Sequence, residues 1–333
     1  MTPSIAAPVF VACIALMLLA SAQFAQRLDH IGLRLGLPET LLGLLTALAA
    51  DAPEVSSAIS ALVQHERAVA VGVVVGSNAF NIAAMLGLSA VVTARVRARH
   101  EALELEAFVG LWLIAVALAV AAGGLGATAG SGLVAAVVVP YVALLAAGPR
   151  LVRRLPLGAA ELRFVRRSFG EGHRRERTLD SRREAAGVLL VLAVALSVIV
   201  AGSVGAVRAA TDLAHAWSVP DALVGVIVLA ILTSLPNAWT GVRFGMQGRG
   251  SALISETLNS NSINVVAGIA LPAALGSLGS FSNLTVFDLA WLFAMTAAAL
   301  VLFGRRAGAG RIAGALLIGL YAVFLAVQIA AAY

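Results

Sequence analysis

Ten apolar segments alternate with short polar connections along the 333-residue chain. Each segment reaches or approaches the ~20 residues that a helix needs to cross a hydrocarbon core of ~30 Å. A strand at that depth would leave its backbone unpaired in lipid, so helices are expected throughout. The pattern therefore predicts an all-α, polytopic membrane protein with ten transmembrane helices. The expected spans are residues 5–24, 39–64, 68–94, 104–123, 128–147, 185–207, 219–243, 251–276, 284–303 and 311–332.

The longest polar connection, residues 148–184, divides the spans five and five. Because five is odd, the second half must enter the membrane in the opposite sense to the first, which predicts two inverted five-helix repeats. We expect a first repeat over 1–147, an arginine-rich linker over 148–184 and a second repeat over 185–333. The linker is too short and too polar for a domain, and it suits contact with anionic lipid headgroups.

Charge supports this count of spans. All 23 basic residues are arginine, and 21 of them lie in or beside the connections that follow the odd-numbered spans. The positive-inside rule then places those connections in the cytoplasm and both termini on the external side, as expected for a bacterial inner-membrane protein. The pI near 10.8 reflects these topology signals, so no nucleic-acid partner is expected.

Composition agrees with a membrane protein and excludes several other classes. Apolar residues make up 60% of the chain and charged residues 12%, unlike a soluble domain of this length. Cys13 is the one cysteine, so an intrachain disulfide is excluded. The five histidines have no metal-ligand spacing, and the sequence contains no nucleophile–base pair or cofactor motif, so we expect neither an enzyme nor a bound cofactor.

The N-terminal segment has a second interpretation. Residues 20–22, Ala-Ser-Ala, follow an apolar run and fit a signal-peptidase site. However, no basic residue precedes this run, and its removal would break the symmetry of five and five. We therefore favour a membrane span over a cleaved signal.

One polar signature occurs twice, each time inside an apolar segment. Residues 51–54 (Asp-Ala-Pro-Glu) match 234–237 (Ser-Leu-Pro-Asn), and residues 76–81 (Gly-Ser-Asn-Ala-Phe-Asn) match 259–264 (Asn-Ser-Asn-Ser-Ile-Asn), at an offset of 183. Ser77 would lie ~14 Å inside its span, near the bilayer centre. Polar groups at this depth are costly and usually functional. Paired segments interrupted by proline point to the binding site of a transporter.

The residue types in this signature suit a hard cation. Each proline frees backbone carbonyls in the preceding turn, and Ala47 and Ala230 are placed to present theirs. Asp51 and Glu54 are three residues apart and share a helix face. Carboxylate, amide, hydroxyl and carbonyl oxygens are ligands for Na⁺ and Ca²⁺. For a single serine or asparagine, packing between helices is the simpler explanation, but it does not explain the duplicated set.

The sequence at 76–81, following the broken Pro-Glu helix at 53–54, resembles the α-repeats of the cation/calcium exchanger superfamily, typified by the sodium/calcium exchangers. The resemblance covers residues 38–90 and 220–272. It implies ten helices in two inverted halves and antiport of Ca²⁺ against Na⁺ by alternating access, with Glu54 as a central ligand. The positions that match the family's cation ligands are Ala47, Ala50, Glu54, Ser77, Asn81, Ala230, Thr233, Asn237, Ser260 and Asn264.

Several positions depart from the pattern of the family. Asn237 replaces a usual acidic residue, Ala50 replaces a hydroxyl residue, and Asp51 stands in place of a typical serine. Negative charge can be regained from Asp51 or from Glu256, although Glu256 can instead pair with Arg249. A site with fewer charged ligands binds Ca²⁺ less tightly.

Three functions therefore remain open. The first is Na⁺/Ca²⁺ antiport, and the second is cation/H⁺ antiport, in which the ions compete for Glu54. The third is a cation channel or facilitator without strict coupling. A scaffold that does not transport is disfavoured, because Glu54, Ser77 and Asn81 are all retained.

Overall fold

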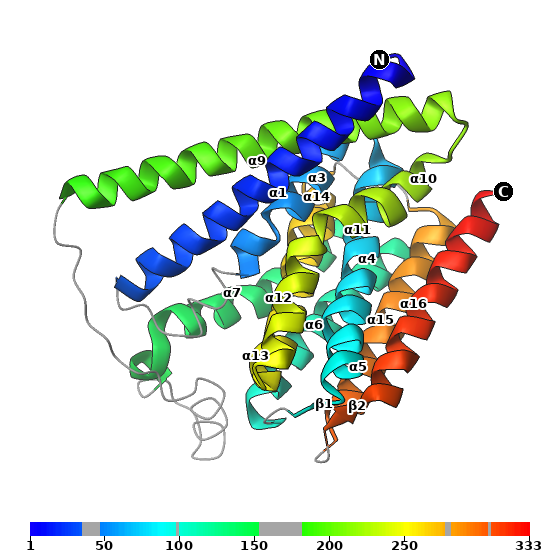
Figure 1. Ribbon diagram of the computed structural model, residues 1–333. Helices are drawn as coiled ribbons and strands as arrows, with labels where there is room; N and C mark the ends of the chain where they lie inside the picture. Colours follow the sequence, from blue (N-terminus) through cyan, green and yellow to red (C-terminus); the bar gives the residue numbers. More distant parts are fainter. Residues whose placement is uncertain (35–46, 98–99, 153–181, 277–280, 306–307) are drawn as a thin grey trace.

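The computed structural model describes residues 1–34, 47–97, 100–152, 182–276, 281–305 and 308–333 (Figure 1). These residues form a bundle of helices and one short pair of strands, β1 (Arg95–Val96) and β2 (Ala309–Gly310), which are antiparallel. The strand pair joins the connection after the third expected span to the connection after the ninth. The all-α prediction is therefore confirmed.

The helices follow the expected spans, with additional breaks. The first half contains α1 (Pro3–Arg34), α3 (Ala52–Val63), α4 (Arg67–Asn81), the π-helical segment η1 (Ile82–Leu88), α5 (Ser89–Thr93), α6 (His100–Ala121) and α7 (Ala127–Val152). The second half contains α9 (Arg182–Ala216), α10 (Asp221–Leu223), the π-helical segment η2 (Val224–Leu229), α11 (Ala230–Thr233), α12 (Leu235–Met246), α13 (Gly250–Val265), the π-helical segment η3 (Val266–Ala270), α14 (Leu271–Ala274), α15 (Asn283–Phe303) and α16 (Arg311–Ala332).

Within the described residues, seven helices are long and apolar enough to cross a membrane, and one further pair, Asp221–Thr233 and Leu235–Met246, is bent by 47°. The expected span 39–64 is described only from residue 47 onward, as helical residues 47–50, a break at Asp51 and the short helix α3. The span expected at 251–276 is helical, but its serines and asparagines lower its apolar character. The helical membrane fold is thus confirmed, whereas the count of ten remains a prediction.

Helices α1 and α9 form a long pair on the outside of the bundle. Figure 1 shows them side by side, with α3 packed beneath them. Both are longer than the spans expected at 5–24 and 185–207. Small residues allow their close contact, since a Cβ atom on Gly202 would lie 3.1 Å from the carbonyl oxygen of Cys13.

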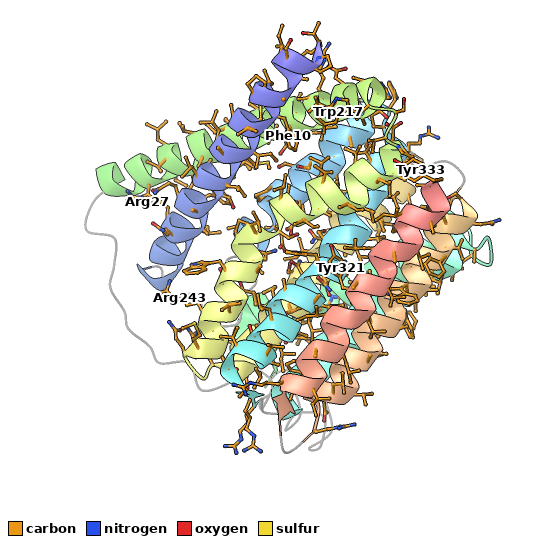
Figure 2. All side chains as sticks on the ribbon, turned by 45° about the vertical axis from the view of Figure 1, so that its right-hand side comes forward. Phe10, Arg27, Trp217, Arg243, Tyr321 and Tyr333 are labelled. Atoms are coloured by element: carbon orange, nitrogen blue, oxygen red, sulfur yellow. The ribbon has the colours of Figure 1, made fainter. Side chains whose placement is uncertain are left out.

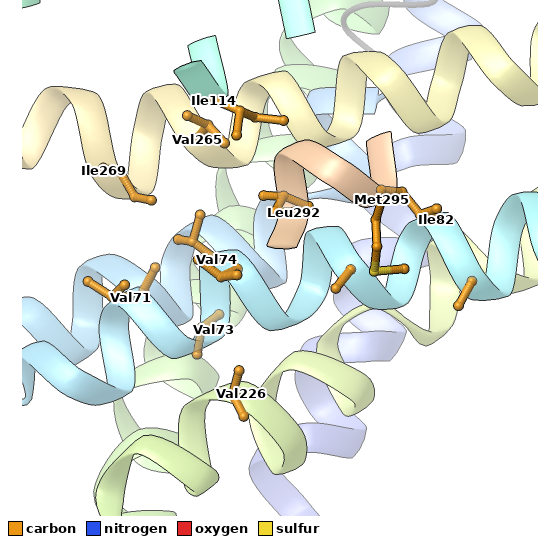
Figure 3. Packing of buried hydrophobic residues seen from close by; sticks show 14 of the residues in the cluster. Val71, Val73, Val74, Ile82, Ile114, Val226, Val265, Ile269, Leu292 and Met295 are labelled. Atoms are coloured by element: carbon orange, nitrogen blue, oxygen red, sulfur yellow. The ribbon is translucent and has the colours of Figure 1, made fainter. Parts of the chain in front are cut away.

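Helix α4 and its continuation through η1 and α5 lie at the centre of the molecule. This segment runs from Arg67 to Thr93. In its apolar stretch of 18 residues, 89% of the residues are buried, a larger share than in the other spanning helices of the described part of the chain. Figure 3 shows Val73 and Val74 of α4 among side chains from η2, α13 and α15, including Val226, Val265 and Leu292. The duplicated polar signature is therefore carried by the most enclosed part of the bundle.

The two ends of the bundle differ in chemistry. Figure 2 shows Trp217 and Tyr333 toward one end and Arg243 toward the other. Figure 1 shows the two termini toward the same end and the β1–β2 pair at the opposite end. This agrees with an even number of crossings, while the side of the membrane that each end faces stays a prediction. Most of the predicted linker 148–184 lies outside the described residues.

Candidate functional site

Two matched helix breaks shape the centre of the molecule. Asp51 precedes α3 with φ −81° and ψ −5°, and Ser234 precedes α12 with φ −86° and ψ 0°. In each case a proline, Pro53 or Pro236, lies in the first turn of the following helix, where its missing N–H costs least. The repeat therefore interrupts both helices at equivalent positions.

The carboxyl groups of Asp51 and Glu54 share a set of hydrogen-bond donors from the second half of the chain. Asp51 Oδ1 accepts from Asn237 Nδ2 at 2.7 Å and from Ser260 Oγ at 2.6 Å. Glu54 accepts from the Ser234 hydroxyl, and its two carboxyl oxygens lie 3.2 and 3.3 Å from Asn237 Nδ2. The Asn237 amide thus bridges two buried acidic groups that lie one helical turn apart.

A layer of asparagines adjoins this acidic pair. Asn81 Nδ2 donates to Ser260 Oγ at 3.1 Å, and Asn264 Nδ2 donates to Asn78 Oδ1 at 3.1 Å. Asn78 and Asn261 also bond to each other across the two halves. All of these residues are at least 97% buried, so the hydrogen bonds join α4 and α13 in the core.

Several oxygen atoms in this cluster are buried without a hydrogen-bond partner. They are Asp51 Oδ2, Asn81 Oδ1, Asn237 Oδ1 and Asn264 Oδ1. A buried acceptor that lacks a partner costs free energy, so such atoms are rare in folded proteins. Four of them within one connected cluster form a set of hard oxygen ligands suited to Na⁺ or Ca²⁺.

The acidic groups of the cluster all come from one half of the chain. Both carboxyl groups come from the first half, whereas the second half supplies the neutral groups of Ser234, Asn237 and Ser260. Among the described residues, no arginine or histidine forms an ion pair with either carboxyl group. A buried carboxylate must be protonated, paired or bound to a cation, which leaves a proton or a cation here.

Other predicted ligands have local partners. The hydroxyl of Ser77 donates to the Val74 carbonyl at 3.2 Å, and that of Thr233 donates to the Leu229 carbonyl at 2.9 Å. The carbonyls of Ala47 and Ala230 accept helical hydrogen bonds from the N–H groups of residues 51 and 234. The Ala230 carbonyl also accepts from the Thr233 hydroxyl at 3.4 Å. A carbonyl or hydroxyl oxygen that accepts no second hydrogen bond keeps a lone pair that a cation can use.

Pro53 also deprives a backbone carbonyl of its helical donor, at a residue that was not among the predicted ligands. The carbonyl left without a helical donor by Pro53 is that of Ala49, four residues earlier. It accepts from Ser21 Oγ of α1 at 3.4 Å. Ala50, the alanine at an expected hydroxyl position, is buried and brings no side-chain oxygen.

Glu256 is partly buried on α13, one helical turn before Ser260. The guanidinium of Arg249 lies over the Phe244 ring, 4.5 Å from its centroid. Asp51, by contrast, is fully buried and bonded to Asn237 and Ser260. Of the two acids, Asp51 is therefore the one that bonds directly to Asn237.

Three residues of the cluster were not among the predicted ligands: Ser234, Asn78 and Asn261. The signal for them was present, because Ser234 is the repeat partner of Asp51, and Asn78 is that of Asn261. The π-helical segments η1 and η3 begin just after Asn81 and Asn264. Such segments often occur at functional sites.

Comparison with known proteins identifies a family that matches both halves of the chain, and individual relatives. The family described as sodium/calcium exchanger protein matches residues 5–147 and 187–330. The inner membrane protein YrbG of Escherichia coli (strain K12) is 26% identical over 297 residues, covering 87% of this chain and 86% of that protein. Human sodium/potassium/calcium exchanger 3 is 31% identical over 68 residues, which cover 20% of this chain and 11% of that protein.

Two solved structures have a similar fold. The sodium-calcium exchanger NCX_Mj aligns with a TM-score of 0.60 and 21% identity, covering 98% of this chain and 99% of that one. The H⁺/Ca²⁺ exchanger CAX aligns with a TM-score of 0.75 and 13% identity, covering 96% and 81%. At these identities the likeness establishes the fold alone.

Proposed function

The chain belongs to the sodium/calcium exchanger protein family, and we propose that it is a secondary active cation antiporter with its ion site between the breaks at Asp51 and Ser234. Members of this family are multi-pass membrane exchangers and not enzymes. Alternating access would expose the same site to each side of the membrane in turn.

The four partnerless buried oxygens carry the proposal. Asp51, Asn81, Asn237 and Asn264 each contribute one such atom, and Glu54 adds its carboxylate. We infer that Glu54 is the central ligand, as the resemblance implies. The hydroxyls of Ser77, Thr233 and Ser260 and the carbonyls of Ala47 and Ala230 would complete the oxygen shell.

The hydrogen bonds of the cluster suggest how an ion would be bound and released. Asn237 and Ser260 point donor groups at the carboxyl oxygens. A cation between those oxygens would displace the donors, and the partnerless amide oxygen of Asn237 would then become a ligand. Release of the ion would restore the hydrogen bonds to Asp51 Oδ1 and to the Glu54 carboxyl group.

Charge limits which ions can exchange. Two carboxylates are neutralised by one divalent cation or by monovalent ions of the same total charge. Na⁺ and Ca²⁺ would therefore compete for the same oxygens and cannot both occupy them fully, which is the requirement for antiport.

A cation/H⁺ antiporter is the second candidate, and one observation favours it. Asp51 and Glu54 share the same Asn237 nitrogen, so their carboxyl groups lie close together. Neighbouring carboxylates without a cation repel, and one then takes up a proton. A proton would in that case be the counter-ion.

The test uses purified protein in proteoliposomes that carry an imposed Na⁺ or H⁺ gradient. Uptake of radioactive Ca²⁺ driven by one gradient identifies the counter-ion, and counterflow of radioactive Na⁺ measures the coupling. Glu54→Gln keeps size and removes charge, and should abolish the coupled flux while the protein remains folded. Ca²⁺ flux that depends on neither the Na⁺ gradient nor the H⁺ gradient would indicate a facilitator. Normal coupled uptake by Glu54→Gln would show that Glu54 is not a ligand of the transported ion.

We further propose that the protein lies in an inner membrane with both termini external. The name of YrbG supports the membrane, and the distribution of arginine supports the orientation.

A further inference from the structure

A second polar cluster, partly buried, joins α6, α7 and α13, apart from the acidic pair. Glu106 Oε1 accepts from Ser255 Oγ at 2.6 Å and from Asn259 Nδ2 at 3.3 Å. The hydroxyl of Tyr141 donates to Asn259 Oδ1 at 2.7 Å. Glu106 and Ser255 both lie about one to two turns into helices that start at the end of the bundle carrying β1 and β2 (Figure 1).

The cluster depends on a departure from the repeated motif. Asn259 occupies the position that corresponds to Gly76 in the first half. Gly76 packs so closely on η2 that a Cβ atom there would lie 2.8 Å from the Cα of Val226. Asn259 instead extends a side chain to α6 and α7. The difference between the two motifs thus creates a polar contact that has no counterpart at Gly76.

The chemistry of the cluster suits a proton better than a metal ion. Glu106 Oε2 is buried and has no hydrogen-bond partner. The donors converge on Oε1, and Asn259 Oδ1 is occupied by Tyr141. Ca²⁺ takes about six to eight oxygen ligands and Mg²⁺ about six, whereas one free carboxyl oxygen is enough to bind a proton.

The charges around Glu106 leave it without a compensating cation. Among the described side chains on the elements packed against α6, the ionisable groups are Tyr141 on α7, Glu256 on α13 and Asp288 on α15. On α6 itself, Glu104 is exposed. No arginine or histidine of the described part of the chain forms an ion pair with Glu106.

We propose that Glu106 is a proton-binding site, with Oε2 as the atom that takes the proton. Ser255 and Asn259 hold the carboxyl group through Oε1, and Tyr141 holds Asn259. Binding converts the carboxylate and a proton from water into a carboxylic acid, and nothing else is consumed. Asn259 is followed directly by Ser260, which donates to Asp51 Oδ1 at 2.6 Å. Helix α13 therefore connects the proton site with the acidic pair.

The coupling of the two sites rests on the proposed function, whereas proton binding at Glu106 does not. An ionised Glu106 adds negative charge near a cation held at Asp51 and Glu54, and a protonated Glu106 removes it. A proton bound at Glu106 should therefore lower the affinity for the cation. A bound cation should favour the ionised form of Glu106 and so lower its affinity for a proton, and linkage requires that the two affinities change by the same factor.

Infrared difference spectroscopy of the full chain in liposomes tests the proton site without any transport. A change of pH in cation-free buffer should reveal a carboxylic acid band that disappears in Glu106→Gln. Glu104→Gln, the same substitution at an exposed position of the same helix, should keep that band. Ser255→Ala should move the midpoint of the band to higher pH, because the carboxylate loses a donor that favours its charged form.

If folded Glu106→Gln keeps every carboxylic acid band of the wild type, the proposal is overturned. If Glu106→Gln does not fold, an unshifted midpoint in Ser255→Ala would overturn it equally.

Calcium binding to the same variants tests the coupling. In Glu106→Gln the pH dependence of Ca²⁺ affinity should weaken, by up to about tenfold per pH unit for one linked proton. Wild-type protein that binds no cation but retains the Glu106 band would refute the proposed function and leave the proton site standing. An unchanged pH dependence together with loss of the band would refute the coupling.

Discussion

Asn78 and Asn261 each donate a side-chain hydrogen bond to the backbone carbonyl of the other, at 3.0 and 3.2 Å. They are separated by 183 residues, the offset of the repeated motif. Their Oδ1 atoms accept from Asn264 and Asn81, which are also repeat partners. A contact between equivalent residues must lie on the axis that relates the two halves, so the pseudo-two-fold axis passes beside the candidate ion site.

Removing either amide of this pair should have the same effect. Asn78→Ala and Asn261→Ala each remove a buried side-chain hydrogen bond between the two halves, and each should lower the free energy of unfolding by about 1–2 kcal/mol. Thermal unfolding in detergent measures the loss. Asn283→Ala, at an exposed position, serves as the control and should be close to neutral. Strongly unequal effects would show that the pair does not lie on a symmetry axis.

Gly76 should be far less tolerant than a glycine on the lipid-facing surface. A Cβ atom at Gly76 would collide with the backbone of Val226, whereas nothing lies within 4 Å at Gly319. Gly76→Ala should cost about 1–3 kcal/mol through overpacking, while Gly319→Ala should be neutral or stabilising by up to ~1 kcal/mol. Melting temperatures of the two variants in the same detergent give the comparison. Equal tolerance would mean that α4 and η2 are not in close contact.

The acidic group of Asp51 should be replaceable by one at position 237. Asp51→Ser removes a charged ligand and should weaken Ca²⁺ binding on the order of tenfold or more. Asp51→Ser combined with Asn237→Asp returns a carboxyl group opposite Glu54 and should recover most of the loss. Isothermal titration of both variants decides it. Failure of the double variant to recover, with the protein folded, would mean that position 237 does not face the ion.

Asn237→Asp alone should bring a third carboxyl group beside Asp51 and Glu54. Three such groups repel without a cation, and one would be protonated. Ca²⁺ affinity should therefore be higher than in the wild type at alkaline pH and should fall more steeply on acidification. Titrations at two pH values test this, and identical curves for the variant and the wild type would contradict it.

The arginine distribution predicts the orientation in the membrane. Reporter fusions at Tyr333 and near residue 167, which lies outside the described residues, should report opposite sides of the membrane. Alkaline phosphatase is active only outside the cytoplasm, so it should be active at Tyr333 and inactive near residue 167. Activity at both positions would contradict the ten-span topology.

The sequence by itself determined the class of the fold and the centre of the site. Hydropathy dictates helices because lipid leaves no other way to satisfy the backbone. The repeat at an offset of 183 identified Asp51, Glu54, Asn237 and Ser260, and these four side chains meet in the structure. Composition and spacing were sufficient because buried polar residues in a membrane are rare.

The tertiary structure decided which of these groups contact one another. Helical periodicity gives the face on which a side chain lies, but not its partner on a helix more than a hundred residues away. Thus the sequence left Asp51 and Glu256 as alternative sources of charge, and packing brought Asp51 into the cluster. The hydroxyls of Ser77 and Thr233 bond within their own helices, because a serine or threonine can satisfy itself locally.

The cluster around Glu106 also depended on tertiary structure. In the sequence, Asn259 is a departure from a glycine, and Glu106 is one acid among several at the start of a span. Packing of α6 and α7 against α13 brings Glu106, Tyr141 and Asn259 together. Long-range packing alone sets such contacts, because hydropathy and repeat spacing record where a residue lies along its own helix and contain no information about the helix opposite.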